Sequence, residues 1–272
     1  ARFKVALTRG VASSFAKALS RTPSPLSVEH ARAQNQRYVQ AISKYVSKVV
    51  EVPSLDDTPD CCFIEDTAVA VGSTVLLTTP GALSRRAEVS GVEEALRSLK
   101  PFVERIVKME DYHAKADNAD ATMDGGDVLY TGRHCFVGLS SRTNHHGLEA
   151  LKELLGPALP GGKESVFGFE VVDDLHLKCV VTHAGNNQLA VNNSDGGRLF
   201  VKQLKQLLGS AHGYGLHLVP HASAANVLRC NDALFVEEEC SNLREIQQLA
   251  SAAGVPSQLL LELENSEFKK AE

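Results

Sequence analysis

The chain has 272 residues, of which 43% are hydrophobic and 22% are charged. That balance is typical of a soluble globular protein and excludes a disordered or fibrous chain. The formal net charge of -5 gives nucleic-acid phosphates no electrostatic attraction. No window approaches the roughly 18 uninterrupted apolar residues that a membrane-spanning helix needs. We therefore expect a protein that contacts neither nucleic acid nor a membrane.

Six cysteines are scattered along the chain without a CxxC pair, although Cys61 and Cys62 are neighbours. A disulfide framework or a cysteine-based metal site would show a more regular spacing. We therefore expect reduced thiols, no metal site, and a cytoplasmic location.

The first part of the chain predicts a strand over Phe3–Thr8, a helix over Val28–Val46 and a second strand over Lys48–Val52. Between the first strand and the helix lies a serine- and proline-bearing segment, Ser13–Leu26, which is a candidate lid over a functional site.

Four later segments each predict a β-hairpin, because an apolar strand, a polar turn and a second apolar strand follow one another. Glycine, asparagine and aspartate in the turns supply the positive φ that tight hairpins require. The predicted hairpins cover Phe63–Leu77, Asp124–Leu139, His176–Val191 and Asn226–Val236.

Each hairpin is followed by a pattern with the 3.6-residue period of a helix and then by a short extended run. The predicted helices cover Ala87–Leu99, Gly147–Leu155, Leu199–Leu208 and Leu243–Ala252. The predicted closing strands cover Arg105–Met109, Val166–Val172, Leu216–Val219 and Gln258–Glu262. The repeating unit is therefore strand–strand–helix–strand.

This repetition predicts a pseudo-symmetric α/β fold in which residues 1–272 form one closed domain of five units. The N-terminal elements make a complete unit except for one hairpin strand. Closing the ring requires that strand to come from the other end of the chain. Because no strand pattern follows Gln258–Glu262, we expect the missing strand to lie just past Glu272.

Acidic residues gather where the predicted hairpins begin. Asp60, Glu65 and Asp66 flank the start of the first hairpin, and Asp124 opens the second. Any one of these acids alone is more often a turn former or a solvated surface group. Acidic groups that recur at equivalent positions of the repeat instead predict a shared receptor for a cation, because a carboxylate on a buried face must find a partner.

His176 opens the third predicted hairpin between two leucines, where a structural histidine is more common than a catalytic one. The acids at equivalent positions favour the catalytic interpretation. An imidazole with an unperturbed pKa of about 6.5 can transfer protons at neutral pH, and a carboxylate behind it fixes the tautomer.

Arg85 and Arg142 each follow a predicted strand and precede a helix. Solvated surface charge is the simplest interpretation of either one. Two arginines at equivalent positions of two repeats could instead clamp a carboxylate through paired N–H groups. Acids at one end of a site and arginines at the other suit a zwitterionic amino acid with a cationic tail.

Several segments, taken in order along the chain, resemble dimethylarginine dimethylaminohydrolase. They are Pro59–Asp66, Pro80–Gly81 with Ser84–Glu88, Ala121–Leu129, Val137–Asn144 and Leu175–Lys178, with weaker similarity at Ala224–Asn226 and Ser266–Glu272. The resemblance implies an α/β-propeller of the guanidino-group-modifying (pentein) superfamily, in which five strand–strand–helix–strand units surround a pseudo-fivefold axis.

The resemblance also implies an activity, namely hydrolysis of asymmetric dimethylarginine or monomethylarginine to citrulline and a methylamine. The partner would be a small guanidino amino acid, and neither a metal nor an organic cofactor would be needed. His176, oriented by Asp124, would be the acid–base in covalent catalysis by a cysteine thiolate.

Substrate-binding roles are implied for six side chains. Asp60, Glu65 and Asp66 would hold the guanidinium or the α-amino end, and Phe63 would pack beside the substrate. The two arginines named above would bind the α-carboxylate.

The family's nucleophile is a cysteine on the C-terminal strand, in a segment resembling Asp-Gly-x-x-Thr-Cys. Since Ser266–Glu272 resembles the residues that lead into that segment, we expect the nucleophile to lie past Glu272. None of the six cysteines present is expected to replace it, because Cys179 and Cys230 lie in predicted strands and the others lie in the binding motif or lack a neighbouring acid or histidine.

Two other functions remain open. One is a deiminase that acts on arginine or a related guanidine, although the compact chain has no long inserted helical region of the kind expected for arginine deiminase. The other is a pseudoenzyme that ends at Glu272 and binds methylarginine or a protein partner without turnover. Such a binder would not need His176 and Asp124.

Overall fold

The computed structural model describes residues 2–20, 25–116 and 121–271. Within these ranges the strands form four three-stranded sheets and one two-stranded sheet. In each three-stranded sheet, two strands of a hairpin pair antiparallel and a third strand, reached through an α-helix, pairs parallel to the second hairpin strand. Such a unit is termed a blade.

The four complete blades have the predicted strand–strand–helix–strand order, so that prediction is confirmed. In chain order they comprise β3 (Ala68–Val71), β4 (Thr74–Leu77), α2 (Val89–Arg97) and β5 (Arg105–Lys108); β6 (Val128–Tyr130), β7 (Cys135–Leu139), α4 (His145–Leu154) and β8 (Val166–Glu170); β9 (Val181–Gly185), β10 (Gln188–Asn192), α6 (Asp195–Leu208) and β11 (Gly215–Val219); and β12 (Leu228–Cys230), β13 (Ala233–Glu237), α8 (Arg244–Ala252) and β14 (Leu260–Leu263). They are numbered blades 1 to 4.

The fifth blade combines β1 (Val5–Arg9), α1 (Val28–Ser43) and β2 (Lys48–Val52), and its two strands pair in parallel. Within the described ranges no strand pairs with the other edge of β1. The remaining helices are α3 (Met109–Ala116), α5 (Leu177–Val180), α7 (Ala222–Ala225) and α9 (Ser266–Lys269), none of which the sequence patterns predicted.

The hairpin turns lie where the sequence predicts them, and their backbone explains the residues used. Gly72, Gly132 and Gly185 have φ of 61°, 83° and 102°, and Asn231 has φ of 53°. Positive φ is unfavourable for most residues but accessible to glycine and asparagine. The local sequence therefore specifies the tight reversal of each hairpin.

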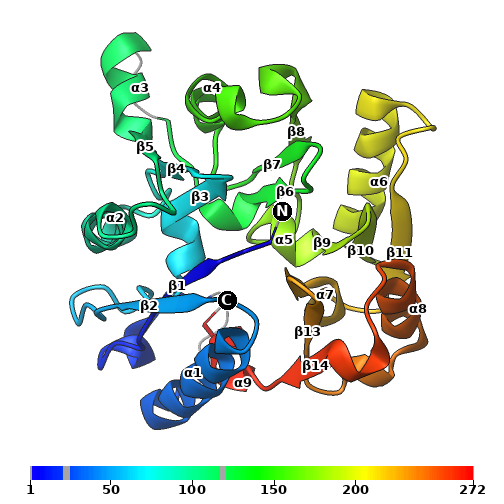
Figure 1. The fold of residues 1–272 in the computed structure, drawn as a ribbon, viewed down its shortest axis with the longest axis horizontal. Helices are drawn as coiled ribbons and strands as arrows, with labels where there is room; N and C mark the ends of the chain where they lie inside the picture. Colours follow the sequence, from blue (N-terminus) through cyan, green and yellow to red (C-terminus); the bar gives the residue numbers. More distant parts are fainter. Residues whose placement is uncertain (1, 21–24, 117–120, 272) are drawn as a thin grey trace.

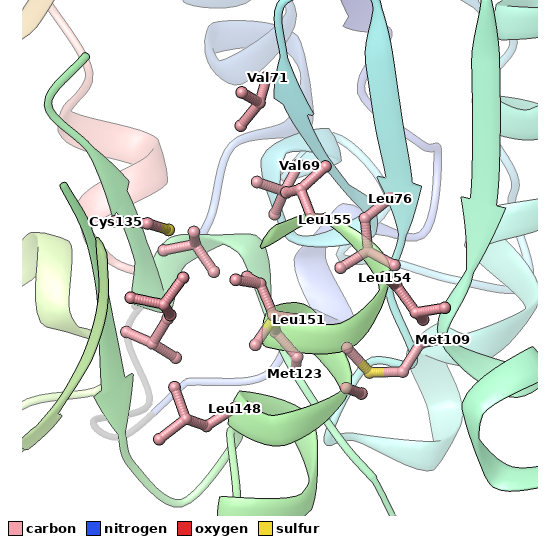
Figure 2. Close-up of a cluster of buried hydrophobic side chains, with 14 of the residues drawn as sticks. Val69, Val71, Leu76, Met109, Met123, Cys135, Leu148, Leu151, Leu154 and Leu155 are labelled. Atoms are coloured by element: carbon pink, nitrogen blue, oxygen red, sulfur yellow. The ribbon is translucent and has the colours of Figure 1, made fainter. Parts of the chain in front are cut away.

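The blades follow one another around a ring, with α1, α2, α4, α6 and α8 on its outer side (Figure 1). Between blades 1 and 2, leucines of α4 face the neighbouring sheets, as Figure 2 shows. Leu148, Leu151 and Leu155 belong to one buried cluster with Val69 and Met123. This confirms the predicted apolar face of the helix, and each fully buried leucine contributes roughly 1.5–3 kcal/mol to stability.

Strand β1 contacts both blade 1 and blade 4, because successive side chains of a strand point to opposite faces. Val5 and Leu7 pack into the cluster shared with blade 1, whereas Ala6 packs into the cluster shared with blade 4. The side chain of Asn231, in the β12–β13 turn, bonds to the backbone of Phe3. The N-terminal strand is thereby fixed against blade 4.

Within the described ranges, no helix combines the length and the apolar character that crossing a bilayer requires.

Candidate active site

One pocket is lined by all eight residues that the sequence singled out. They are Asp60, Phe63, Glu65, Asp66, Arg85, Asp124, Arg142 and His176. The structure therefore brings together side chains from three blades and from the loops before them. The role of each in binding or catalysis stays a prediction.

The segments that enter the pocket are short helical turns, where the sequence predicted the beginning of a strand. Residues Ile64–Thr67 and Gly125–Asp127 form 3₁₀ turns, and Leu177–Val180 form α5. The predicted starts of the three hairpins at Phe63, Asp124 and His176 were therefore wrong. Local hydrogen bonds win over the strand pattern, because the amide N–H of the third residue after each start bonds back to its carbonyl.

The catalytic pair predicted from the sequence is formed. His176 Nε2 lies 3.1 Å from Asp124 Oδ2, and the two side chains are 12% and 1% exposed. Asp124 Oδ1 accepts a hydrogen bond from the Gly81 backbone N–H at 2.9 Å. Burial alone would lower the pKa of His176, but the hydrogen bond to Asp124 and the negative charges of Asp66 and Asp127 outweigh it and raise the pKa.

Gly126 allows the imidazole and a second carboxylate to approach the same backbone segment. A Cβ atom at this position would lie 2.9 Å from ring atoms of His176 and 2.9 Å from Asp66 Oδ1. The Gly126 N–H donates to that same oxygen at 2.9 Å. A larger residue would therefore displace the ring or the carboxylate.

Asp66 is held by a buried ion-pair network. Arg85 Nη1 donates to Asp66 Oδ2 at 2.6 Å, and Arg85 Nε and Nη2 donate to the two carboxylate oxygens of Glu88 at 3.2 and 2.9 Å. Burial alone would raise the pKa of Asp66, but the positive charges of His176 and Arg85 lower it. Asp66 therefore stays ionised at neutral pH.

These bonds change the expectation for Arg85. The sequence predicted a guanidinium that binds a ligand carboxylate, but the residue is 5% exposed and its Nη2 also donates to the carbonyl oxygen of Phe63 at 3.0 Å. Of its five N–H groups, at most one on Nη1 is left for a ligand.

Arg142 differs from Arg85 in that its guanidinium has no partner among the described residues. The loop between β7 and α4 carries it, and within the described ranges its side chain makes no hydrogen bond or ion pair. A Cβ atom at Gly81 would lie 2.4 Å from the Arg142 carbonyl oxygen, so the two loops are in close contact. Arg142 is thus the cation that is available to an anionic ligand group.

Asp60 lies in the same pocket as the two arginines. Its Oδ1 accepts a hydrogen bond from the Leu19 backbone N–H at 3.0 Å, and burial raises its pKa. Leu19 also lines the pocket, in keeping with a lid in this segment, although residues 21–24 of the candidate lid lie outside the described ranges. Phe63 packs edge-on against Phe268, with ring centroids 6.1 Å apart.

Glu65 is the most exposed of the predicted acids, with a side chain 61% exposed. Its Oε1 accepts a hydrogen bond from Lys178 Nζ at 2.7 Å. Lys178 was not predicted to belong to the site, although the residue stands two positions after His176. The ion pair links the first helical turn to α5 across the pocket.

Cys179 also lines the pocket. It lies in α5 and is partly exposed, so the prediction that it lies in a strand was wrong. Cys61, Cys135, Cys230 and Cys240 are buried, and burial raises the pKa of Cys135 to about 12. A thiol with such a pKa is a poor nucleophile at neutral pH.

Three side chains could in principle hold a metal ion. Single ligand atoms of Asp66, Asp124 and His176 lie within 4.8 Å of one another. However, Asp66 is already bonded to Arg85 and the other two are bonded to each other. A cation among them would be repelled by the adjacent guanidinium, so we assign no metal here.

The chain matches known proteins over most of its length. A family model described as arginine deiminase matches residues 26–195. N(G),N(G)-dimethylarginine dimethylaminohydrolase of Streptomyces coelicolor is 37% identical over 180 residues, which cover 61% of this chain and 64% of that protein, so the match spans less than two thirds of that relative. Putative hydrolase DDAH2 of Bos taurus is 32% identical over 226 residues, covering 82% and 73%.

Solved structures share the fold. A mutant of the Pseudomonas aeruginosa DDAH in complex with citrulline has a TM-score of 0.79 and 23% identity, covering 100% of this chain and 96% of that chain. The substrate-bound N-terminal domain of ArgZ, a cyanobacterial arginine dihydrolase, has a TM-score of 0.75 and 16% identity, covering 98% and 93%. Together with the sequence matches, these similarities show that the chain belongs to the dimethylarginine dimethylaminohydrolase family of the pentein superfamily.

Proposed function

We propose that the protein hydrolyses asymmetric dimethylarginine and monomethylarginine to citrulline and dimethylamine or methylamine. The observation that carries this proposal is the arrangement of one pocket, in which a buried His176–Asp124 pair and an ionised Asp66 share the space with the unpaired guanidinium of Arg142. The name of the Streptomyces relative and the citrulline complex of the Pseudomonas relative support the same reaction.

A methylated arginine carries a cation at one end and a zwitterion at the other, and the charges in the pocket are complementary to both. Asp66, fixed by Arg85 and Gly126, would bind the guanidinium, with Glu65 nearby. The Asp60 carboxylate, which the Leu19 backbone N–H holds in the pocket, would accept the α-amino group. The guanidinium of Arg142 would bind the α-carboxylate.

The proton transfers of the reaction would follow from the protonation state of His176. A thiolate attacks the guanidinium carbon, and the bond from that carbon to the methylated nitrogen then breaks. Because its raised pKa favours the imidazolium, His176 can donate the proton that the departing amine needs. The neutral imidazole then takes a proton from water, which attacks the thiouronium carbon and releases the sulfur.

We propose that the thiolate belongs to a cysteine on a strand that pairs with the free edge of β1, as the family resemblance implies. Among the described residues β1 pairs with β2 alone, whereas the central strand of each three-stranded sheet pairs on both sides. Thr8 Oγ1 and two guanidinium nitrogens of Arg9, at the end of this strand, are buried without a hydrogen-bond partner there. Such orphaned groups support a missing backbone neighbour.

The reaction is tested by incubating the native full-length protein with dimethylarginine, monomethylarginine and arginine. Citrulline and the released amine are then quantified. We expect citrulline with dimethylamine or methylamine from the methylated substrates. Absence of citrulline from all three would contradict a hydrolase and leave a binding protein.

The position of the nucleophile is tested by a variant of the cysteine that lines the pocket. A Cys179→Ser variant should retain turnover, since the proposed nucleophile lies elsewhere. Loss of turnover in Cys179→Ser, with dimethylarginine still bound, would instead identify this pocket thiol as the nucleophile.

The match of residues 26–195 to the arginine deiminase model supports one competing function, deimination of unmethylated arginine. The same assay decides between them, because a deiminase would release ammonia and would prefer arginine over its methylated forms.

A further inference from the structure

Asp127 is a buried carboxylate outside the eight predicted residues and outside the pocket lining. It is 0% exposed, and both of its oxygens are used. Oδ1 accepts the Leu177 backbone N–H at 2.9 Å, and Oδ2 accepts the hydroxyls of Ser140 and Thr143 at 2.6 and 2.7 Å. Three separate parts of the chain therefore meet at one side chain.

The bond to Leu177 fixes the acid–base end of the pocket. Leu177 is the first residue of α5, and His176 directly precedes it. The backbone N–H groups in the first turn of a helix have no partner within the helix. By accepting one of them, Asp127 holds the peptide bond that carries His176.

The bonds to the two hydroxyls fix the loop that carries Arg142 and connect it to Asp124. Ser140 Oγ accepts the backbone N–H of Arg142 at 3.0 Å, so Asp127 acts through Ser140 on the loop that carries the unpaired guanidinium. Thr143 Oγ1 accepts the backbone N–H of Asp124 at 3.1 Å, so the partner of His176 is held through the same carboxylate.

Each hydroxyl has a fixed direction, since it donates to Asp127 and accepts from a backbone N–H. An asparagine would place N–H₂ where one carboxylate oxygen now accepts, which would leave either the two hydroxyls or the Leu177 N–H without an acceptor. The space is also closed, because a Cβ at Gly138 would lie 2.7 Å from Asp127 Oδ1. An aspartate side chain therefore fits the space and satisfies all three donors, namely the Leu177 N–H and the two hydroxyls.

We propose that Asp127 is a positioning residue that couples the two ends of the substrate pocket, holding the His176 loop and the Arg142 loop in one arrangement. The inference rests on the proposed function, since it assigns one end to proton transfer and the other to the α-carboxylate. Asp127 touches neither substrate nor the reacting atoms and acts through Leu177, Ser140 and Thr143.

The experiment compares Asp127→Asn and Thr143→Val with the wild-type chain by calorimetric titration with dimethylarginine and citrulline. The His176 titration is followed by NMR and the melting temperature by calorimetry. We expect roughly 10- to 100-fold weaker binding of both ligands, together with a lower pKa of His176 in Asp127→Asn. Thr143→Ser keeps the hydroxyl and should recover binding, and the exposed control Asp195→Asn should match wild type.

Three outcomes separate the possibilities. If the wild type binds neither ligand, the proposed function fails, whereas the His176 titration still tests the coupling. If the wild type binds and Thr143→Val binds equally well with an unchanged His176 titration, Asp127 is structural and the inference is wrong. If Asp127→Asn does not fold, Thr143→Val against Thr143→Ser gives the same decision, because this pair removes and restores one of the three bonds.

Discussion

His176 Nε2 and Asp124 Oδ2 lie 3.1 Å apart although 52 residues separate them in sequence. The two residues stand at the beginning of helical turns that precede β6 and β9, the first hairpin strands of blades 2 and 3. Pseudo-symmetry of the blades therefore brings equivalent positions together near the ring axis. The two side chains are almost fully buried from solvent, so the electrostatic interaction between them is strong.

Replacing Asp124 with asparagine is expected to lower the pKa of His176, because a neutral amide no longer stabilises the imidazolium. The pH dependence of the imidazole NMR signals measures this directly. Asp195→Asn removes a carboxylate that is 83% exposed and should leave the titration unaltered. A His176 titration that is the same in Asp124→Asn and wild type would show that the pair has no electrostatic coupling.

The raised pKa of His176 also predicts how stability depends on pH. Since the pKa is higher in the folded than in the unfolded protein, the protonated form stabilises the fold. This contribution is complete below the unfolded pKa of about 6.5 and is lost as the pH rises through the folded pKa. The difference in unfolding free energy between wild type and His176→Gln should therefore be larger near pH 6 than near pH 9. Urea denaturation at both pH values checks the sign, and a difference that grows with pH would contradict it.

A His176→Ala variant of the full-length protein is expected to bind dimethylarginine but to lose turnover by roughly 10²- to 10⁴-fold, the usual contribution of general acid–base catalysis. Citrulline formation and ligand affinity are measured on the same preparation. His145→Ala, at an exposed position in α4, is the matched control and should keep full turnover. Unaltered turnover in His176→Ala would remove this residue from the mechanism.

Arg85→Met is expected to lower the free energy of unfolding by about 3–5 kcal/mol, because it leaves Asp66 and Glu88 buried without their cation. Arg97→Ala breaks an exposed ion pair on α2 and should cost no more than about 0.5 kcal/mol. Chemical denaturation distinguishes the two. If Arg85→Met is as stable as Arg97→Ala, the buried network is not what holds Asp66.

In contrast to Arg85→Met, Arg142→Ala is expected to weaken ligand binding without lowering stability. Its guanidinium has no partner among the described residues, so the melting temperature should not change. Dimethylarginine and citrulline should bind roughly 10- to 100-fold more weakly, since a charge-assisted hydrogen bond to the α-carboxylate is lost. Arg198→Ala on α6 is the exposed control. Equal affinity in Arg142→Ala would place the carboxylate elsewhere.

Much of the fold could be predicted because periodic signals are local. Turn residues such as Gly72 and Asn231 mark the reversals, and apolar residues such as Leu148 and Leu151 mark the buried helix face. The helical turns before β3, β6 and β9 could not be predicted this way. The turn after His176 is stabilised by a bond from the Leu177 N–H to Asp127, which lies 50 residues earlier, and no local sequence pattern indicates such a contact.

The sequence predicted which residues line the pocket better than it predicted the hydrogen bonds and ion pairs between them. Charged residues at equivalent positions of the repeats indicate a shared pocket, but they do not reveal which charges pair with one another. Arg85 is bonded to Asp66 and Glu88, whereas Arg142 is unpaired among the described residues. The Lys178–Glu65 ion pair likewise spans 113 positions of sequence and depends on how two blades meet.

We propose that one pocket binds a methylated arginine at both ends. This proposal is tested by an NMR titration with asymmetric dimethylarginine, followed through the imidazole signals of His176 and the guanidinium Nε signal of Arg142. We predict that both sets of signals shift along one saturation curve with one ligand bound per chain. Movement of only one set, or two curves with different midpoints, would contradict it.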